Sequence, residues 1–251
     1  MDLGFKVSIL SGASFHHLAY EAAGSGASHV LHVYIEHDGT PWLLNSVVSE
    51  DPTPRNPLAL ELMARDEGPR LLLGRPCYYA LRHEHGCGAK LWTQDRYSPA
   101  VIDSMVAALR AFLSTRSFRQ VVLIGYSGGG TIAWLIAERL PETSSVVTVA
   151  ANLDIDYWTQ IHGYSRLAGS LNPAFRPPLP AKIRQVHYFG ARDENVPPSV
   201  LRSFALHHPA AQIVEVADFD HRCCWTKRWP QLLHAATRPS SALEGSITRQ
   251  D

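Results

Sequence analysis

The chain has 251 residues, of which 45% are hydrophobic and 18% charged, so it contains enough apolar material for a large buried core. Lysine plus arginine equals aspartate plus glutamate at 23 each, and this balance excludes a global electrostatic attraction to nucleic acid. We therefore expect no nucleic-acid partner, one α/β domain over residues 1–235, and a disordered polar tail over residues 236–251.

The first residues of the chain predict neither an export signal nor a membrane span. Residues 1–15 carry Asp2, Lys6 and one short apolar patch at residues 7–10, too weak for a signal h-region and too short to cross a bilayer. As written, the chain is expected to be soluble and cytoplasmic. It would be periplasmic if the true start lay upstream and carried an export signal.

The redox state of the four cysteines would indicate the cellular compartment of the protein. Cys77 and Cys87 bracket nine residues and are able to form a bridge, whereas the neighbours Cys223 and Cys224 would need a strained ring to pair with each other. Four cysteines allow three connectivities, and the sequence does not choose among them or exclude four reduced thiols. A bridge would indicate an oxidising compartment.

The first third of the chain predicts strands, a turn-rich segment and a short helix. Residues 14–20 alternate loosely between polar and apolar, and residues 30–35, VLHVYI, are a clear strand candidate. Three prolines within residues 51–57 forbid regular structure there. A short helix is then expected over residues 58–65 and a strand over residues 71–73.

Residues 75–96 are irregular, aromatic and rich in histidine, and we expect them to form a loop over the sheet. The cluster HEHGC at residues 83–87 contains metal-binding residue types, but no second ligand pair follows at the spacing of a closed zinc site. A polar loop is the favoured interpretation, and no metal is expected. Ser98 and Pro99 then cap and open a helix whose apolar residues recur at helical intervals as far as residue 113.

The central stretch is QVVLIGYSGGGT, residues 120–131. An unbroken apolar run is typical of a strand buried on both faces of a mostly parallel sheet, and apolar residues at helical spacing follow from residue 131 to residue 140. Ser127 therefore lies at a sharp strand-to-helix turn with glycines two residues before and two after it. This context is typical of the G-x-S-x-G turn that presents a nucleophilic serine. The alternative is an ordinary glycine-rich connection.

Further elements follow the expected helix after Ser127. Residues 152–180 show little periodicity and contain several prolines, so we expect a short lid-like insertion or pocket wall there. The remaining elements are predicted as strands over residues 146–150, 186–189 and 213–216, and as helices over residues 199–205 and 224–234. Together these patterns predict an α/β fold with a mostly parallel central sheet and flanking helices.

A serine hydroxyl becomes a good nucleophile only when an imidazole accepts its proton and a carboxylate orients that imidazole. In sheets of this kind the partners follow later strands, in the order serine, acid, histidine. Asp193 comes just after the strand at 186–189, and His221 just after the strand at 213–216. We therefore predict Ser127, Asp193 and His221 as the catalytic residues.

Other residues compete for the two partner positions. Asp154 and Asp156, which follow the preceding strand, are alternative acids, and so is Glu194 beside Asp193. Of the other late histidines, His234 is expected within a helix beyond the sheet edge, while His207 and His208 are expected to end a helix. His221 is the favoured base.

The tetrahedral intermediate of acyl transfer also needs donors for its oxygen, usually two backbone N–H groups. Gly128, immediately after the serine, is expected to supply one. The loop at residues 36–42 is expected to supply the other from Asp38, with His37 and Gly39 as alternatives, while the Asp38 side chain turns away to bond the loop. A simple Asp-Gly turn is the competing interpretation.

With these residues in place, the chain resembles the α/β-hydrolase fold superfamily over nearly its whole length. It is most similar to a group of little-characterised bacterial α/β hydrolases, through segments similar to LHVYIEHDGTPW, DPTPRNPLAL, GRPCYY, RYS, GYSGGG and DHRCCW. The resemblance implies the same roles for Ser127, Asp193 and His221. It also leads us to expect a glycine in place of His37, so the oxyanion loop should be more crowded here. Members often carry an exported or lipoprotein-like start, which this sequence does not show.

The leading functional hypothesis is a serine hydrolase that cleaves a small-molecule carboxylic ester, thioester or small amide through an acyl-enzyme, without cofactor. An acyltransferase with the same triad and a catalytically silent binding protein are the alternatives. The glycines lack the G-x-G-x-x-G spacing of dinucleotide sites, and no lysine follows them as in a phosphate-binding P-loop.

Overall fold

The computed structural model describes residues 4–26, 28–44 and 46–238, and its sheet is the central layer of the molecule. The strands are β1 (Lys6–Ser11), β2 (His16–Ala22), β3 (Val30–Ile35), β4 (Trp42–Leu43), β5 (Val47–Val48), β6 (Arg70–Leu73), β7 (Gln120–Tyr126), β8 (Thr143–Val149), β9 (Arg184–Gly190) and β10 (Gln212–Val216). The helices are α1 (Leu58–Met63), α2 (Pro99–Ser114), α3 (Gly128–Ala137), α4 (Ile155–His162), α5 (Pro198–His207) and α6 (Trp225–Thr237). Short 3-10 turns occupy Tyr79–Leu81, Ala89–Trp92 and Pro173–Phe175.

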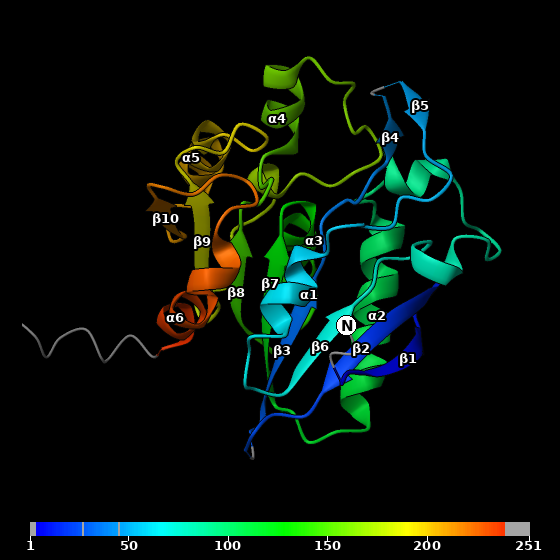
Figure 1. Cartoon of the computed structure of the whole chain (residues 1–251), viewed down its shortest axis with the longest axis vertical. Helices are drawn as coiled ribbons and strands as arrows, with labels where there is room; N and C mark the ends of the chain where they lie inside the picture. The colour runs from blue at the N-terminus through cyan, green and yellow to red at the C-terminus, as the bar shows by residue number, and fades with distance from the viewer. Residues whose placement is uncertain (1–3, 27, 45, 239–251) are drawn as a thin grey trace, which may run out of the picture.

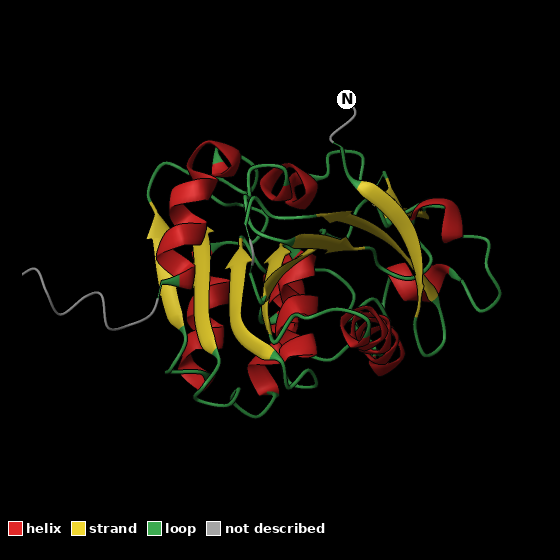
Figure 2. Ribbon diagram, turned by 90° about the horizontal axis from the view of Figure 1, so that it is seen from below, coloured by secondary structure: helices red, strands yellow, loops and turns green. Residues whose placement is uncertain are grey.

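The main sheet has eight strands in the order β1-β2-β6-β3-β7-β8-β9-β10. Strand β2 is antiparallel to both of its neighbours, and every pair from β6 to β10 is parallel. Parallel strands need their faces covered, and Figure 2 shows helices on both sides of the sheet. This confirms the predicted α/β fold with its mostly parallel sheet.

Two hydrophobic layers bury the two faces. One layer joins the sheet to α2 and α3, and its largest member is the fully buried Trp134. The other joins the opposite face to α1 and α6 through Leu62, Trp225 and Trp229. Because β7 is central and buried on both faces, the turn that follows it is held from several directions.

Most predicted elements are confirmed to within a few residues. The strand at residues 30–35 coincides with β3, and Ser98 caps α2 by accepting from the Val101 amide at 3.4 Å. Strand β2 begins two residues later than predicted, because Gly12 and Phe15 close the β1–β2 turn. Strand β1 was not predicted; it lies at the edge of the sheet, where most of its residues are exposed.

Two helices differ from their predictions. Helix α3 begins at Gly128, three residues before the predicted start, because close packing favours glycines that helix propensity alone would exclude. Helix α4 forms inside the insertion at residues 152–180. Asp154 caps its start through the Tyr157 amide, and Gly163, at φ +64°, ends it in the left-handed conformation.

At the C-terminus, α6 continues through Thr237, so residues 236 and 237 are helical where the tail was expected to have begun. The rest of the predicted tail, from residue 239, lies outside the described residues. Within the described part of the chain, no helix is long and apolar enough to cross a membrane.

The cysteines form two bridges. Cys77 pairs with Cys87 inside the loop over the sheet, and Cys223 pairs with Cys224 in the segment before α6. The first pairing was one of the connectivities that the sequence allowed. The pairing of Cys223 with Cys224 completes that connectivity, which the sequence left open while noting that neighbouring cysteines would need a strained ring.

Candidate active site

Ser127 occupies the sharp turn between β7 and α3. Its backbone lies at φ +52° and ψ −124°, a region that residues other than glycine rarely adopt. Neighbouring glycines make the turn possible, since a Cβ at Gly125 would collide with the Gly129 backbone and one at Gly129 with the Ile35 carbonyl. The strand and helix therefore approach closely, as the glycine spacing predicted.

His221 and Asp193 lie in line with the Ser127 hydroxyl. The Nε2 atom of His221 is 3.1 Å from Ser127 Oγ, and its Nδ1 atom is 2.8 Å from Asp193 Oδ2. With Nδ1–H donating to the carboxylate, Nε2 is left to accept the serine proton. The structure thus brings together the three residues predicted from chain order, although they are 94 and 28 positions apart.

Local contacts hold both partners in place. The Asp193 side chain is fully buried, and its Oδ1 atom accepts from the backbone amides of Asn195 and Val196 at 2.9 and 2.8 Å. The carbonyl of His221 accepts from the buried Trp225 indole at 3.2 Å. The Asp220 carboxylate further fixes this turn by accepting from two following amides, a role that the sequence analysis did not assign.

The competing acids have other partners. Asp154 caps α4 and bonds Ser203 at 2.7 Å, while Asp156 bonds Asn172 at 3.1 Å. Glu194 lines the cavity beside His221, but the described contacts show no bond between them. Neither of the earlier aspartates takes the position of Asp193.

The competing histidines are also engaged elsewhere. His208 is buried and bonds the Pro173 carbonyl at 3.0 Å, and burial lowers its pKa. His207 lies in the last turn of α5, with its ring tilted against that of Phe175, while His234 lies in the last turns of α6. His221 is the histidine that contacts Ser127.

The backbone amides of the loop after β3 differ in whether they have a hydrogen-bond acceptor. The His37 amide donates to Glu36 Oε1 at 3.1 Å, the Gly39 amide to His37 Nδ1 at 3.0 Å, and the Thr40 amide to the Pro52 carbonyl at 2.9 Å. In residues 37–40 the Asp38 amide is therefore the one without an acceptor among the described contacts. This is the amide that the sequence favoured as an oxyanion donor.

The Asp38 side chain does not bond its own loop, which corrects the prediction. It lies against Gly128, where an added Cβ would collide with Asp38 Oδ1. Its carboxylate accepts from Arg75, from Arg96 at 3.0 Å and from the Tyr97 hydroxyl at 2.6 Å. Burial alone would raise the pKa of Asp38, but the two guanidinium groups and this hydroxyl together hold it well below its usual range.

His37 occupies the position where a glycine was expected. Its Nε2–H donates to the Asn56 carbonyl at 3.2 Å, and its ring packs edge-on against Tyr126, with centroids 5.4 Å apart. Burial lowers the pKa of His37 to about 4, so the ring is neutral at pH 7. The loop accommodates the imidazole by turning it toward the proline-rich segment.

Glu36 is a buried carboxyl that the sequence analysis used only as part of a loop. It is 2% exposed and accepts from the His37 amide and, at 3.3 Å, from the Leu60 amide in the first turn of α1. Burial raises the pKa of Glu36 to about 7. Glu36 therefore caps the first turn of α1. The sequence signal for this role was its position directly after the buried strand β3.

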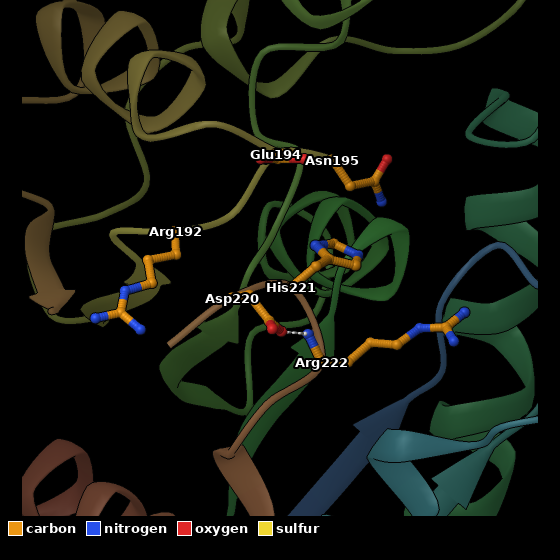
Figure 3. Close-up of a pocket in the computed structure, with 6 residues that line it drawn as sticks. All are labelled: Arg192, Glu194, Asn195, Asp220, His221 and Arg222. Carbon is orange, nitrogen blue, oxygen red and sulfur yellow. Dashed lines mark hydrogen bonds between the residues drawn. The ribbon is translucent and has the colours of Figure 1, made fainter. Parts of the chain in front are cut away.

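A cavity of about 620 Å³ opens beside His221. Figure 3 shows the side chains that line it, which come from the turns after β9 and β10. They are Arg192, Glu194, Asn195, Asp220, His221 and Arg222. In Figure 1, α4 and the β4–β5 hairpin stand at the same, upper end of the sheet.

The histidine-rich loop shows no metal centre. Across residues 4–26, 28–44 and 46–238, no group of three or more histidine, cysteine, aspartate or glutamate side chains is arranged to hold an ion. Glu84 of the HEHGC cluster instead lies 3.2 Å from His16 of β2. The HEHGC cluster therefore contributes to packing of the loop against β2.

Comparisons with known proteins give the fold but no close relative. No protein-family model and no curated protein matches the chain. Among solved structures, an α/β serine hydrolase without lid from Xanthomonas campestris is 12% identical, with a TM-score of 0.58 and coverage of 94% of this chain and 96% of its own. An α/β serine hydrolase homologue from Coxiella burnetii is 15% identical, with a TM-score of 0.56 and coverage of 93% and 96%.

An esterase from Pyrococcus furiosus is similarly related, at 12% identity and a TM-score of 0.63, with coverage of 94% of this chain and 93% of its own. At these identities the likeness extends over the whole domain but concerns the backbone arrangement. The likeness identifies the fold of this chain, whereas its chemistry has to be inferred from the residues of the site.

Proposed function

We propose that this chain, whose fold is that of the α/β hydrolases, is a serine hydrolase that cleaves a carboxylic ester, thioester or small amide through an acyl-enzyme on Ser127. One observation carries the proposal: the Ser127 hydroxyl, the His221 imidazole and the buried Asp193 carboxylate form a continuous chain of hydrogen bonds at 3.1 and 2.8 Å. A neutral imidazole in this tautomer is suited to accept the hydroxyl proton during attack.

The reaction follows from this geometry. Ser127 Oγ attacks the carbonyl carbon while His221 Nε2 takes its proton, and Asp193 stabilises the resulting imidazolium. The imidazolium then gives the proton to the departing alcohol, thiol or amine, which leaves the acyl group on Ser127. A water molecule activated by the same imidazole releases the acid and restores the serine.

The negative oxygen of the tetrahedral intermediates needs donors that are free before substrate arrives. The amides of Asp38 and Gly128 meet this requirement, because the described contacts assign neither an acceptor. Gly128 is the first residue of α3, so the positive end of the helix also favours charge at this point. These two amides are the proposed oxyanion donors.

The substrate is proposed to enter beside His221 over the cavity there. The insertion at residues 152–180 supplies a wall, since Trp158 Nε1 and His162 Nε2 both donate to the Asn195 carbonyl, at 2.7 and 2.9 Å. This pairing ties α4 to the turn that carries Asp193. The insertion is therefore proposed to act as a pocket wall beside the acid turn.

The test is a fluorophosphonate labelling assay followed by a panel of p-nitrophenyl esters of rising acyl length. The wild-type chain should label at one serine and release nitrophenol, and Ser127→Ala should abolish both with little change in thermal midpoint. Ser114→Ala is a control at an exposed serine in the last turn of α2, before β7 begins. Equal labelling of Ser127→Ala, or no labelling of the wild type, would contradict the proposal.

A further inference from the structure

A buried cluster of charges holds the oxyanion loop from outside. Arg75 lies just beyond β6, whereas Arg96 and Tyr97 lie just before α2, and all three donate to the Asp38 carboxylate. Arg75 also donates to the Arg96 carbonyl at 2.9 Å, which links the two segments. Asp38 is thus bound to residues from elements that are remote in sequence.

The side chains of this cluster are largely buried, and together they carry an excess positive charge. The side chains of Arg75 and Arg96 are 2% and 7% exposed, and Tyr97 is fully buried. Two guanidinium groups face one carboxylate, and the Arg75 guanidinium also lies over the rings of Tyr78 and Tyr97. Burying two guanidinium groups against a carboxylate that is 19% exposed is costly, and apolar packing would serve stability as well, so the arrangement calls for another role.

The position of the cluster indicates that role. An added Cβ on Gly128 would meet both the Asp38 carboxylate and the Tyr97 hydroxyl, so the cluster touches the first residue after the serine. The Tyr78 hydroxyl donates to the Asp38 carbonyl at 3.0 Å. Asp38 is therefore held at its side chain and at its carbonyl, and its amide is left free.

We infer that Arg75, Arg96, Tyr78 and Tyr97 are positioning residues that orient the Asp38 amide toward the substrate carbonyl oxygen above Ser127. The inference rests on the proposed serine-hydrolase function and deepens it. The excess guanidinium charge also offsets the negative charge of Asp38, which would otherwise oppose an oxyanion beside Gly128. None of the four side chains needs to touch the substrate.

The first test compares two matched tyrosines. Tyr97→Phe removes a buried hydroxyl that donates to Asp38 at 2.6 Å. Tyr34→Phe removes a buried hydroxyl on β3 that donates to Asp66 at 2.7 Å and also accepts from the Trp229 indole at 3.1 Å. Tyr97→Phe should lower kcat by about tenfold to a hundredfold with KM little changed, because a misaligned donor weakens transition-state binding. Tyr34→Phe should leave kcat within about twofold.

The second test uses an aryl trifluoromethyl ketone, which adds to a nucleophilic serine and forms a stable tetrahedral oxyanion. Its affinity should fall in parallel with kcat in Tyr97→Phe and should fall furthest in Arg96→Met. Arg96→Lys restores the charge without the fork geometry and should recover part of the loss. A purely structural role would lower the active fraction of protein without changing the ketone affinity of the remainder.

The outcomes separate the inference from the function on which it rests. Wild-type protein that neither labels with fluorophosphonate nor cleaves any ester would overturn the proposed function and this inference together. Active wild type with equal kcat and ketone affinity in Tyr97→Phe and Tyr34→Phe would overturn the inference alone. A selective loss in Tyr97→Phe, with partial recovery in Arg96→Lys relative to Arg96→Met, would support it.

Discussion

Asp193 and Asp38 are two carboxylates beside the same serine, and they are held in opposite ways. Asp193 accepts from amides two and three residues further along its own turn and from His221. Asp38 accepts from two arginines and a tyrosine that lie 37, 58 and 59 positions away. The comparison shows that one site can depend on a local turn for its acid and on distant segments for its oxyanion loop.

The two carboxylates also differ in what they offer the reaction. Asp193 acts through its charge, because the imidazolium formed in the proposed mechanism needs a buried anion. Asp38 is proposed to act through its amide, and its charge is neutralised by Arg75 and Arg96. Removing the charge should therefore affect turnover by different routes at the two positions.

The largest effect is expected at Asp193. Asp193→Asn should lower turnover of a p-nitrophenyl ester by about 10⁴-fold, the magnitude known for the equivalent change in a serine protease, because the amide favours the wrong imidazole tautomer. Asp154→Asn, at a carboxylate that caps α4, should stay within about tenfold. Steady-state kinetics of the two variants provide the measurement, and a crippled Asp154→Asn beside an active Asp193→Asn would reverse the assignment.

Asp38→Asn should have the next largest effect, on both activity and stability. Turnover should fall by about 10²-fold to 10³-fold as the oxyanion donor loses alignment. Leaving two buried guanidinium groups without an anion should also lower the free energy of unfolding by about 3–5 kcal/mol. Urea denaturation and ester kinetics measure the two effects.

Asp66→Asn is the matched control for Asp38→Asn, because Asp66 is a buried carboxylate that bonds Tyr34 and His32 away from the serine. It should lower stability with little change in kcat. If Asp38→Asn and Asp66→Asn both retain wild-type kcat, the role proposed for Asp38 beside Ser127 is wrong.

A smaller effect is expected at the Cys77–Cys87 bridge, which lies in the segment that carries Arg75 and Arg96. Cys77 is buried with Tyr78 and Trp92, so opening the bridge should loosen the support of Asp38 but leave the Asp193 turn unchanged. The double variant Cys77→Ser with Cys87→Ser should lose about 2–3 kcal/mol of stability and up to about tenfold in kcat.

Mass spectrometry after alkylation checks the state of the bridge directly. Without reductant, Cys77 and Cys87 should resist alkylation, and with reductant both should be labelled. Labelling of all four cysteines in the untreated protein would show that the bridge is absent. It would also remove the reason to expect an oxidising compartment.

The smallest effect on activity is expected at Glu36, a third carboxyl beside the site, where the change is in the pH dependence of stability. Burial raises the pKa of Glu36 from 4.5 to about 7, so between these values the folded protein holds a proton that the unfolded chain lacks. The stability from this group is complete below pH 4.5 and declines by about 1.4 kcal/mol per pH unit until the pH reaches the folded pKa.

Glu36→Gln removes this titration, so the variant should lose less stability than the wild type between pH 4.5 and 7. Urea denaturation at a series of pH values measures the difference, and kcat should change only slightly. Identical pH profiles for the two proteins would show that Glu36 is not held neutral in the fold.

Several features of this protein were predictable because their causes are local. Gly125, Gly128 and Gly129 around Ser127 predict a turn that other residues would not permit. In a parallel sheet, the loops after successive strands meet at one edge, so chain order alone brings Asp193 and His221 toward Ser127. These regularities predicted the fold and the three central residues of the site.

Only the tertiary structure decided the surroundings of Asp38, the burial of Glu36 and the pairing of the cysteines. The sequence indicated that the Asp38 amide would face the site, but it did not indicate that Arg75 and Arg96 would neutralise its side chain. Those contacts join segments with no regular periodicity, across separations that follow from how loops pack over the sheet. Local propensity carries no information about such contacts, because their energy arises from burial and charge pairing that exist only once the chain is folded.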